Sequence, residues 1–409
     1  MELFHILSVL IVLSAGFAYI NFRFLKLPAA IGLMLVSLVF SMIIIVVGYF
    51  FPVIKDDLTA HLSSINFSDL LLEGMLSFML FAGAIHIKFK DLSNERLAIL
   101  LFSTISVLIS TFAVGYISYG LLNSFGIEVS LIQALLFGAL ISPTDPIAVL
   151  SILKSAGVSK SLETKIAGES LFNDGVAVVV FITIFQLAKP GAVFDAGSIA
   201  TLFFKEAVGG IVFGLAIGYI AYKLIASIDN YQVEVLITLA TVMGGYTFAH
   251  YLHISGPLAM VIAGLITGNK AKSLGMSDIT ANYVDKFWEL VDEILNAILF
   301  VLIGLELLII QTSKTVLMVS VILIFVVLII RYISVYIPSL AIRLKEKLTQ
   351  GTLLLLTWGG LRGGISIALA LSISPEMNRE IWVTITYVIV CFSILVQGMT
   401  VGKVAKRLN

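Results

Sequence analysis

Long apolar runs, separated by short polar stretches, repeat from one end of the chain to the other. Each run has roughly 20 residues, the length that an α-helix needs to cross the hydrocarbon core of a membrane. Runs of this length favour helices rather than the short alternating strands of a β-barrel. The pattern predicts about thirteen membrane-spanning helices. They lie near residues 3–21, 28–50, 68–87, 97–122, 130–154, 162–188, 198–225, 233–252, 256–268, 285–310, 316–341, 350–373 and 380–401.

Composition and charge agree with this pattern. Of the 409 residues, 59% are hydrophobic and 12% are charged, against about 45–50% and about 25% in soluble domains. Residues 1–409 are therefore predicted to be one all-α polytopic membrane unit. Basic residues gather in alternate loops, roughly 18 on one side against 5 on the other, which places the N-terminus outside and the C-terminus in the cytoplasm. These loops are explained as topology signals, so no nucleic-acid partner is expected.

Two predicted spans are interrupted in equivalent positions. The fifth contains SPTDP, in which Pro143 and Pro146 bracket Thr144 and Asp145, and the twelfth contains WGGLRGG around Arg362. Proline removes a backbone donor and glycine loosens a helix, so both spans are predicted to be unwound near mid-membrane. Similar spacing between matching segments of the two halves predicts inverted six-helix repeats with broken helices 5 and 12. This architecture is typical of secondary transporters, whose sites lie at discontinuous helices.

The sixth span carries an unusual density of polar groups. In the segment GESLFND, helical spacing puts Glu169, Ser170, Asn173 and Asp174 on one broad face. The short connection to the fifth span brings Asp145 near them. Carboxylates and hydroxyls are hard oxygen ligands, which suit an alkali cation or a proton. Alternatively, Glu169 or Asp145 could be only a structural ion-pair partner.

Two intramembrane cations limit this alternative. Arg331 and Arg362 each need a carboxylate or a helix C-terminus as partner. Three buried acids against two arginines leave roughly one carboxylate without a permanent partner. Such a group can hold either a proton or a metal cation, which is the chemical basis of exchange.

Another acidic stretch lies in the tenth span and allows two interpretations. Asp292 and Glu293 could form only an exposed helix start, or Glu293 and Asn296 could line a cavity. The sequence pattern is compatible with both.

Together these motifs resemble the cation:proton antiporters of the NhaP type, relatives of the sodium/proton exchangers. The resemblance rests on SPTDP, GESLFNDG, LIIRYISVY and WGGLRGGISIAL, in this order along the chain. It implies a thirteen-helix fold that works as a homodimer by an elevator-like movement. A core domain with crossed broken helices would include about 68–188 and 285–373, and a dimerisation domain would use the remaining helices.

The resemblance also implies residue roles. Asp174 would be the essential carboxylate that carries either cation or proton, with Asn173 as its partner. The Na⁺ ligands would be Asp174, Asp145, Ser170 and Thr144, the last through its main-chain carbonyl, and Glu169 would support the site. Arg331 would pair with Glu169, and Arg362 would stabilise the unwound twelfth helix. One departure is Ala82, where many relatives carry an acidic residue.

The function implied is exchange of Na⁺ or Li⁺ for H⁺ across a bacterial inner membrane, in sodium transport and pH homeostasis, with no cofactor and no enzymatic step. Because the motif is Asn-Asp, with one acid rather than two, electroneutral exchange is expected. A K⁺/H⁺ antiporter of the same fold is the main alternative, followed by a cation-coupled solute symporter. A channel lacks a recognisable filter sequence here, and an intramembrane acid enzyme lacks a second nucleophile–base constellation.

Overall fold

The computed structural model describes residues 2–51, 67–145, 147–189, 196–310, 312–342 and 350–408, so Pro146 lies outside the described residues. The first half of the chain contains α1 (Glu2–Ile20), η1 (Asn21–Leu25), α2 (Ala29–Phe50), α4 (Phe67–Asp69), η2 (Leu70–Met75), α5 (Leu76–Ile85), α6 (Phe89–Asn94), α7 (Arg96–Ser124), α8 (Leu131–Ile141), α9 (Ile147–Ser155) and α10 (Lys160–Leu187). The second half contains α11 (Ala196–Ile225), α12 (Tyr231–Leu252), α13 (Gly256–Ile266), η3 (Thr267–Ala271), α14 (Lys272–Leu274), α15 (Asp278–Glu306), α16 (Lys314–Ile342), α17 (Gln350–Trp358), α18 (Gly364–Leu371), η4 (Pro375–Met377), α19 (Arg379–Phe392), η5 (Ser393–Gln397) and α20 (Gly398–Leu408).

The all-helical class predicted from the apolar runs is confirmed. Within the described ranges no strand forms, and nine helices are long and apolar enough to cross a membrane. The total of thirteen spans and the inverted repeat stay predictions. Several helices begin where the sequence supplies a cap. Ser130 and Gln133 form a capping box at α8, and Ser159 caps α10.

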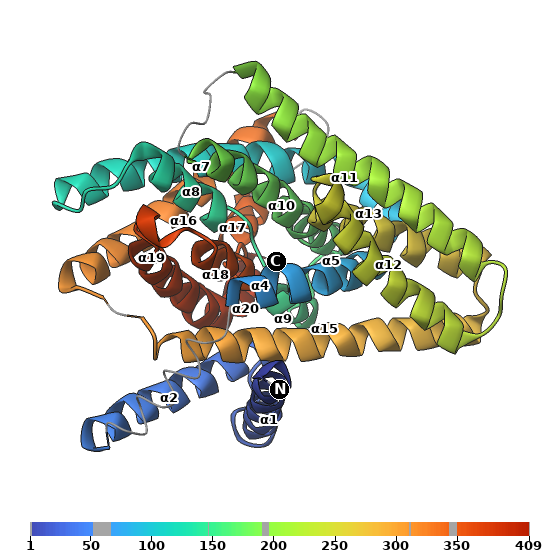
Figure 1. The fold of residues 1–409 in the computed structure, drawn as a ribbon, viewed down its shortest axis with the longest axis horizontal. Coiled ribbons are helices and arrows are strands. Elements are labelled where there is room, and N and C mark those ends of the chain that lie inside the picture. Colours follow the sequence, from blue (N-terminus) through green and yellow to red (C-terminus); the bar gives the residue numbers. More distant parts are fainter. Residues whose placement is uncertain are drawn as a thin grey trace.

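The helices pack side by side in one bundle (Figure 1). In it, α7 contacts α8, α10 and α16, and α19 contacts α16 and α18. Elsewhere α13 contacts α5 and α11, and α15 contacts α2, while α10 contacts both α7 and α13. The division into a core and a dimerisation domain stays a prediction; α5 and α15, assigned above to the core, contact α13 and α2 of the remaining helices.

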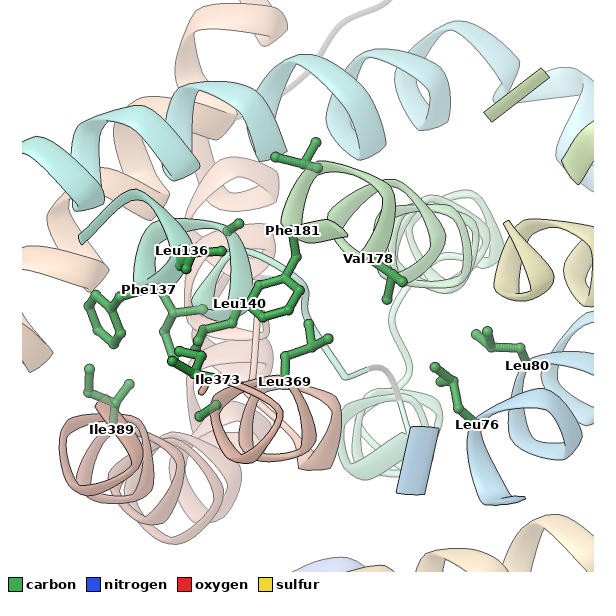
Figure 2. Close-up of a cluster of buried hydrophobic side chains, with 14 of the residues drawn as sticks. Leu76, Leu80, Leu136, Phe137, Leu140, Val178, Phe181, Leu369, Ile373 and Ile389 are labelled. Carbon is green, nitrogen blue, oxygen red and sulfur yellow. The ribbon is translucent and has the colours of Figure 1, made fainter. Parts of the chain in front are cut away.

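A continuous apolar core surrounds the middle of α8, α10 and α18. Figure 2 shows Leu140 of α8, Phe181 of α10 and Leu369 of α18 pointing toward one another. All three side chains are buried. Because this packing fixes the three helices against each other, the polar segments that continue from them have defined positions.

Both predicted breaks are present, and they meet. α8 ends at Ile141 and α9 begins at Ile147, while α17 ends at Trp358 and α18 begins at Gly364. The two connecting segments run past each other as an isolated antiparallel bridge, in which the Asp145 N–H donates to the Leu361 carbonyl at 2.7 Å. Four half-helices therefore end or begin around one point inside the molecule.

Candidate ion-binding site

The polar segment of α10 lies inside the protein and faces the break between α8 and α9. Glu169, Ser170, Asn173 and Asp174 are all buried, and Asp174 retains 7% of its surface. Burial alone does not define a face of α10, because Leu171, Ala177 and Val179 of the same helix are buried as well. No apolar helix would place these groups here for packing alone, because each carries a desolvation penalty.

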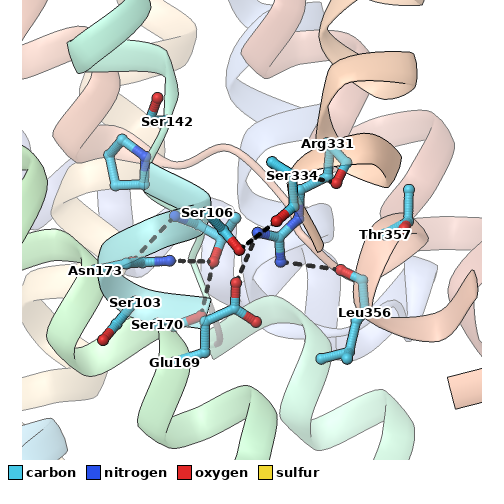
Figure 3. Close-up of polar contacts among 12 residues, drawn as sticks. Ser103, Ser106, Ser142, Glu169, Ser170, Asn173, Arg331, Ser334, Leu356 and Thr357 are labelled. Atoms are coloured by element: carbon cyan, nitrogen blue, oxygen red, sulfur yellow. Dashed lines mark hydrogen bonds and ion pairs between the residues drawn. The ribbon is translucent and has the colours of Figure 1, made fainter. Parts of the chain in front are cut away.

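A hydrogen-bonded network joins α10 to the first break (Figure 3). The Asn173 side-chain amide donates to Thr144 Oγ1 at 2.8 Å, and the Thr144 N–H donates to Asn173 Oδ1 at 3.4 Å. Thr144 Oγ1 lies 3.0 Å from Ser170 Oγ. Asn173 therefore holds Thr144 by both ends of its amide, which fixes the non-helical backbone beside Asp174.

Asp145 follows Thr144 and lies against the start of α18. A Cβ atom at Gly363 would stand 2.5 Å from Asp145 Oδ2, so only glycine lets the two segments approach this closely. Gly363 is the N-cap of α18, where free backbone N–H groups and the helix dipole favour negative charge. Asp145 also lies close enough to Asp174 to interact with it electrostatically.

A cavity of about 720 Å³ reaches this point. Its inner wall includes Thr144, Asp145 and Asp174. Its other lining residues include charged side chains near helix ends, among them Lys88, Asp91, Lys154, Lys160 and Glu163. Asp91 and Lys160 form an ion pair of 3.0 Å there, with the Lys160 side chain largely exposed. Asp174 thus has a polar route to one side of the protein.

Glu169 is engaged elsewhere, although it lies on the same helix. Arg331 Nη1 is 2.6 Å from Glu169 Oε1, and both side chains are buried. Arg331 Nη2 also donates to the Leu356 carbonyl near the end of α17, at 3.0 Å. The pairing that the resemblance implies for these two residues is therefore present, and it ties α10 to α16 and α17 (Figure 3).

Arg362 connects the two breaks. Its Nη1 donates to the Ser142 carbonyl at 2.6 Å and to the Pro143 carbonyl at 2.8 Å. These carbonyls follow the C-terminus of α8, the negative end of that helix, where a cation is stabilising. Arg362 therefore lies in the broken twelfth span and binds the broken fifth span. The resemblance implies only that it stabilises the twelfth.

The sequence did not predict that α15 contributes carboxylates to the wall of the cavity. Asp285, Glu289 and Asp292 all line the cavity, whereas Glu293 is exposed. Their spacing of i, i+4 and i+7 places them on one helix face. Both interpretations of this stretch were wrong in part: Glu293 is exposed and Asn296 is buried without lining the cavity, whereas Asp292 lies well inside α15 and lines it.

Ala82 is fully buried. The wall of the cavity along α5 is formed by Leu76, Met79, Leu80 and Gly83. At this level α5 contributes apolar surface to the cavity, and the carboxylates come from the segment after α8, from α10 and from α15.

The charged side chains around the two breaks and the cavity therefore separate into two sets. Arg331 pairs with Glu169, and Arg362 binds backbone carbonyls. Among the described residues, neither Asp174 nor Asp292 forms an ion pair with a lysine or an arginine. An oxygen-lined position reached by a cavity and without a fixed counter-cation can accept a small cation or a proton.

Comparison with known proteins gives a consistent result. Residues 9–407 match the family model described as sodium/hydrogen exchanger, transmembrane. The chain is 46% identical to the Na⁺/H⁺ antiporter NhaP of Pseudomonas aeruginosa over 98% of this chain and 96% of that protein. It is 34% identical to the Na⁺/H⁺ antiporter NhaH of Halobacillus dabanensis over 95% and 93% of the two chains.

A solved structure shares the fold. The sodium proton antiporter MjNhaP1 of Methanocaldococcus jannaschii superimposes with a TM-score of 0.78, covering 100% of this chain and 99% of that one at 22% sequence identity. The arrangement of helices is thus similar over the whole length.

Proposed function

Because this chain belongs to the sodium/hydrogen exchanger family, we propose that it exchanges Na⁺ or Li⁺ for H⁺ across the cell membrane. The observation that carries the proposal is Asp174, a buried carboxylate without a basic partner among the described residues, at the inner wall of the cavity. Transport rather than catalysis also agrees with the named relatives, which are antiporters.

In this proposal, Na⁺ and H⁺ compete for the same group. Na⁺ would be held by carboxylate oxygens of Asp174 and Asp145, the Ser170 hydroxyl and the Thr144 main-chain carbonyl, all hard ligands. A proton would instead neutralise Asp174 directly. An unloaded carboxylate is costly in an apolar environment, so the empty site would cross the membrane least readily. Exchange follows, since only loaded forms return.

One cation for one proton fits the charges around the site. Asn173 has no titratable proton, and Glu169 is balanced by Arg331 at 2.6 Å. In this proposal Asp145 stays charged throughout the cycle, so only Asp174 gains or loses a proton. Electroneutral exchange is the corresponding expectation.

Orientation and assembly complete the proposal. The cavity opens beside Lys88, Lys154 and Lys160, which belong to the loops that the basic-residue bias assigns to the cytoplasm. The N-terminus would then lie outside, and the structure would represent an inward-open state. The transporter would act as a homodimer in a bacterial inner membrane and contribute to pH homeostasis.

The test is transport by purified protein in proteoliposomes with an imposed pH gradient. Addition of Na⁺ or Li⁺ to the wild-type protein should dissipate the gradient. Asp174→Asn should abolish this response, because the asparagine amide has neither the negative charge that binds the cation nor a titratable proton. Asp278→Asn, which removes an exposed carboxylate at the start of α15, is the matched control and should transport normally. Na⁺ transport by the Asp174→Asn protein would disprove the assignment.

The same vesicles address selectivity and charge balance. A stronger response to K⁺ than to Na⁺ would identify the alternative antiporter. If an imposed membrane potential shifted the final Na⁺ gradient, exchange would be electrogenic and the single-carboxylate stoichiometry would be wrong.

A further inference from the structure

Two polar side chains of the last span are buried away from the ion cavity. Ser393 and Gln397 lie in η5, a π-helical turn between α19 and α20, and both are almost fully buried. Within the described part of the chain, neither side chain lines the cavity. Burial of a hydroxyl and an amide in a membrane helix is costly unless both are hydrogen-bonded. The partners of these two groups therefore indicate their role.

Ser393 and Gln397 are hydrogen-bonded to each other and to the break of the twelfth span. The Arg362 N–H donates to Ser393 Oγ at 2.9 Å, and Ser393 Oγ donates to Gln397 Oε1 at 2.8 Å. Gln397 Nε2 donates in turn to the Trp358 carbonyl at 3.0 Å. Trp358 is the last residue of α17, and Arg362 lies just before the start of α18. The relay formed by Ser393 and Gln397 thus holds both ends of the segment between these half-helices.

The backbone of the break needs such partners, and the π-helical turn lies directly against it. The Trp358 carbonyl ends a helix and the Arg362 N–H lies outside one, so neither has a full set of helical bonds. In the turn, the Gly398 N–H donates to the Ser393 carbonyl, a bond that spans one residue more than in an α-helix. Turns of this kind are frequent at functional sites. A Cβ at Gly398 would lie 3.7 Å from the Leu361 side chain, so the turn packs on the middle of the segment that it bonds.

The segment held by the relay makes the contacts that place the ion site. The Leu361 carbonyl accepts from the Asp145 N–H at 2.7 Å. Arg362 Nη1 donates to the Pro143 carbonyl at 2.8 Å. Thr144 and Asp145, which follow, line the cavity. A shift of the segment would therefore move the backbone that carries these two residues, although the residues themselves are unchanged.

The break of the fifth span is held in a comparable way. There the Asn173 amide bonds Thr144 with both of its ends. The Gln397 amide likewise uses both ends, one on Ser393 and one on the Trp358 carbonyl. Asn173 belongs to the span after the first break, and Gln397 belongs to the span after the second. Each broken span is thus bonded by an amide of the span that follows it.

We propose that Ser393 and Gln397 are positioning residues of the ion site, which set its Na⁺ affinity by fixing the break of the twelfth span. The inference rests on the proposed exchange of Na⁺, and it adds two residues that do not line the cavity. Loss of either side chain leaves buried polar atoms unpaired and frees one end of the segment. Na⁺ binding then weakens, because Asp145 no longer has one fixed position.

The test measures Na⁺-dependent exchange in proteoliposomes that contain equal amounts of folded transporter. Ser393→Ala and Gln397→Met should each raise the apparent KM for Na⁺ about three- to tenfold, as expected for one lost hydrogen bond. The rate at saturating Na⁺ should stay near that of the wild type. A purely structural role would instead lower the yield of folded protein and leave the KM unchanged.

Thr400→Ala is the matched control. It removes the hydrogen bond that the Trp358 indole Nε1 donates to Thr400 Oγ1 at 2.9 Å, and this bond does not involve the backbone of the break. The KM of this variant should equal that of the wild type. An equal rise of the KM in Thr400→Ala and in Gln397→Met would overturn the proposal, because any loosening of the last span would then have the same effect.

A double variant tests whether the two residues act as one relay. Because either change breaks the same chain of bonds, Ser393→Ala/Gln397→Met should raise the KM no more than the larger single effect. Effects that add on the logarithm of the KM would contradict the relay. An unchanged KM in either folded single variant would overturn the proposal, and if one variant does not fold, the other decides. Absence of Na⁺ exchange by the wild-type protein would instead contradict the proposed function.

Thermal stabilisation by Na⁺ provides a measurement that is independent of transport. In detergent, Na⁺ should raise the melting temperature of the wild-type protein, because the ion binds the folded state. Ser393→Ala and Gln397→Met should need about three- to tenfold more Na⁺ for the same increase. The same Na⁺ dependence in the wild type and both variants would show that Ser393 and Gln397 do not position the site.

Discussion

At the scale of single residues, α10 shows how neighbours decide what a buried carboxylate does. Glu169 and Asp174 are both acidic, lie on one helix and are buried. Glu169 lies 2.6 Å from Arg331 and is neutralised by it. Asp174 instead faces the cavity beside Asp145. The first therefore has a fixed counter-charge, and the second is the carboxylate that we propose to bind the exchanged ion.

Replacement of Glu169 by Gln should therefore lower the free energy of unfolding, because Arg331 loses its partner. The variant leaves a buried guanidinium without its counter-charge, which typically destabilises by about 3–5 kcal/mol. The double variant Glu169→Gln/Arg331→Met removes both charges and should recover most of the loss. Thermal unfolding of the detergent-purified proteins would measure this. Equal melting temperatures for the single and double variants would show that the ion pair does not matter for stability.

At the scale of helices and their connections, the crossing of the two breaks depends on close backbone contact. Gly360 lies against the Arg331 side chain, and Gly363 against the Asp145 carboxylate. Gly363 has φ of −121°, which any residue can adopt. The requirement for glycine there is space beside Asp145, not backbone conformation.

Gly363→Ala should accordingly displace Asp145 and weaken Na⁺ binding. The added methyl carbon would stand 2.5 Å from Asp145 Oδ2, and overpacking of this kind typically costs about 1–3 kcal/mol. The apparent KM for Na⁺ in proteoliposomes should rise, with a modest fall in melting temperature. Gly244→Ala is the control, because nothing lies within 4 Å of a Cβ at that position of α12. A variant of Gly363 with normal Na⁺ affinity would contradict this role of the crossing.

The elements that depend on local chemistry could be predicted from the sequence. Proline and glycine disrupt helices wherever they occur, so both breaks were predictable, as was the cluster of polar residues within α10. The full length of two helices could not be predicted in this way. α1 extends through a π-helical turn to Leu25, and α19 extends through η5 and α20 to Leu408. The apolar pattern ends earlier in both places, because amphipathic turns at a helix end carry too little apolar signal.

Contacts between distant segments were harder to predict. That Arg362 needs a helix C-terminus or a carboxylate follows from burying its charge, but the choice of the Ser142 and Pro143 carbonyls depends on the crossing geometry. Asp292 was missed for a different reason. A carboxylate close to other charged residues near a predicted helix start looks solvent-exposed, and only the packing of α15 along the cavity shows that it faces inward.

At the scale of the whole molecule, the cavity is asymmetric. It connects Asp174 to the side of the protein that carries Lys88, Lys154 and Lys160. On the assigned topology, Lys314 at the start of α16 lies on the opposite side. A transporter that works by alternating access opens its site to one side of the membrane at a time. The cavity and Lys314 should therefore be reached by external reagents from opposite sides.

Site-directed cysteine labelling can test this arrangement. In a Cys391→Ser background, which removes the only native cysteine, Glu289→Cys in the cavity wall should react with a membrane-impermeant maleimide only in inside-out vesicles. Lys314→Cys, an exposed position, should react only in right-side-out vesicles. Each variant serves as the orientation control for the other, because their expected patterns are opposite. Reaction of both cysteines from the same side would contradict the assigned topology. Protection of Glu289→Cys in both preparations would contradict an inward-open cavity, since a residue that lines an open cavity must be reached from the side on which that cavity opens.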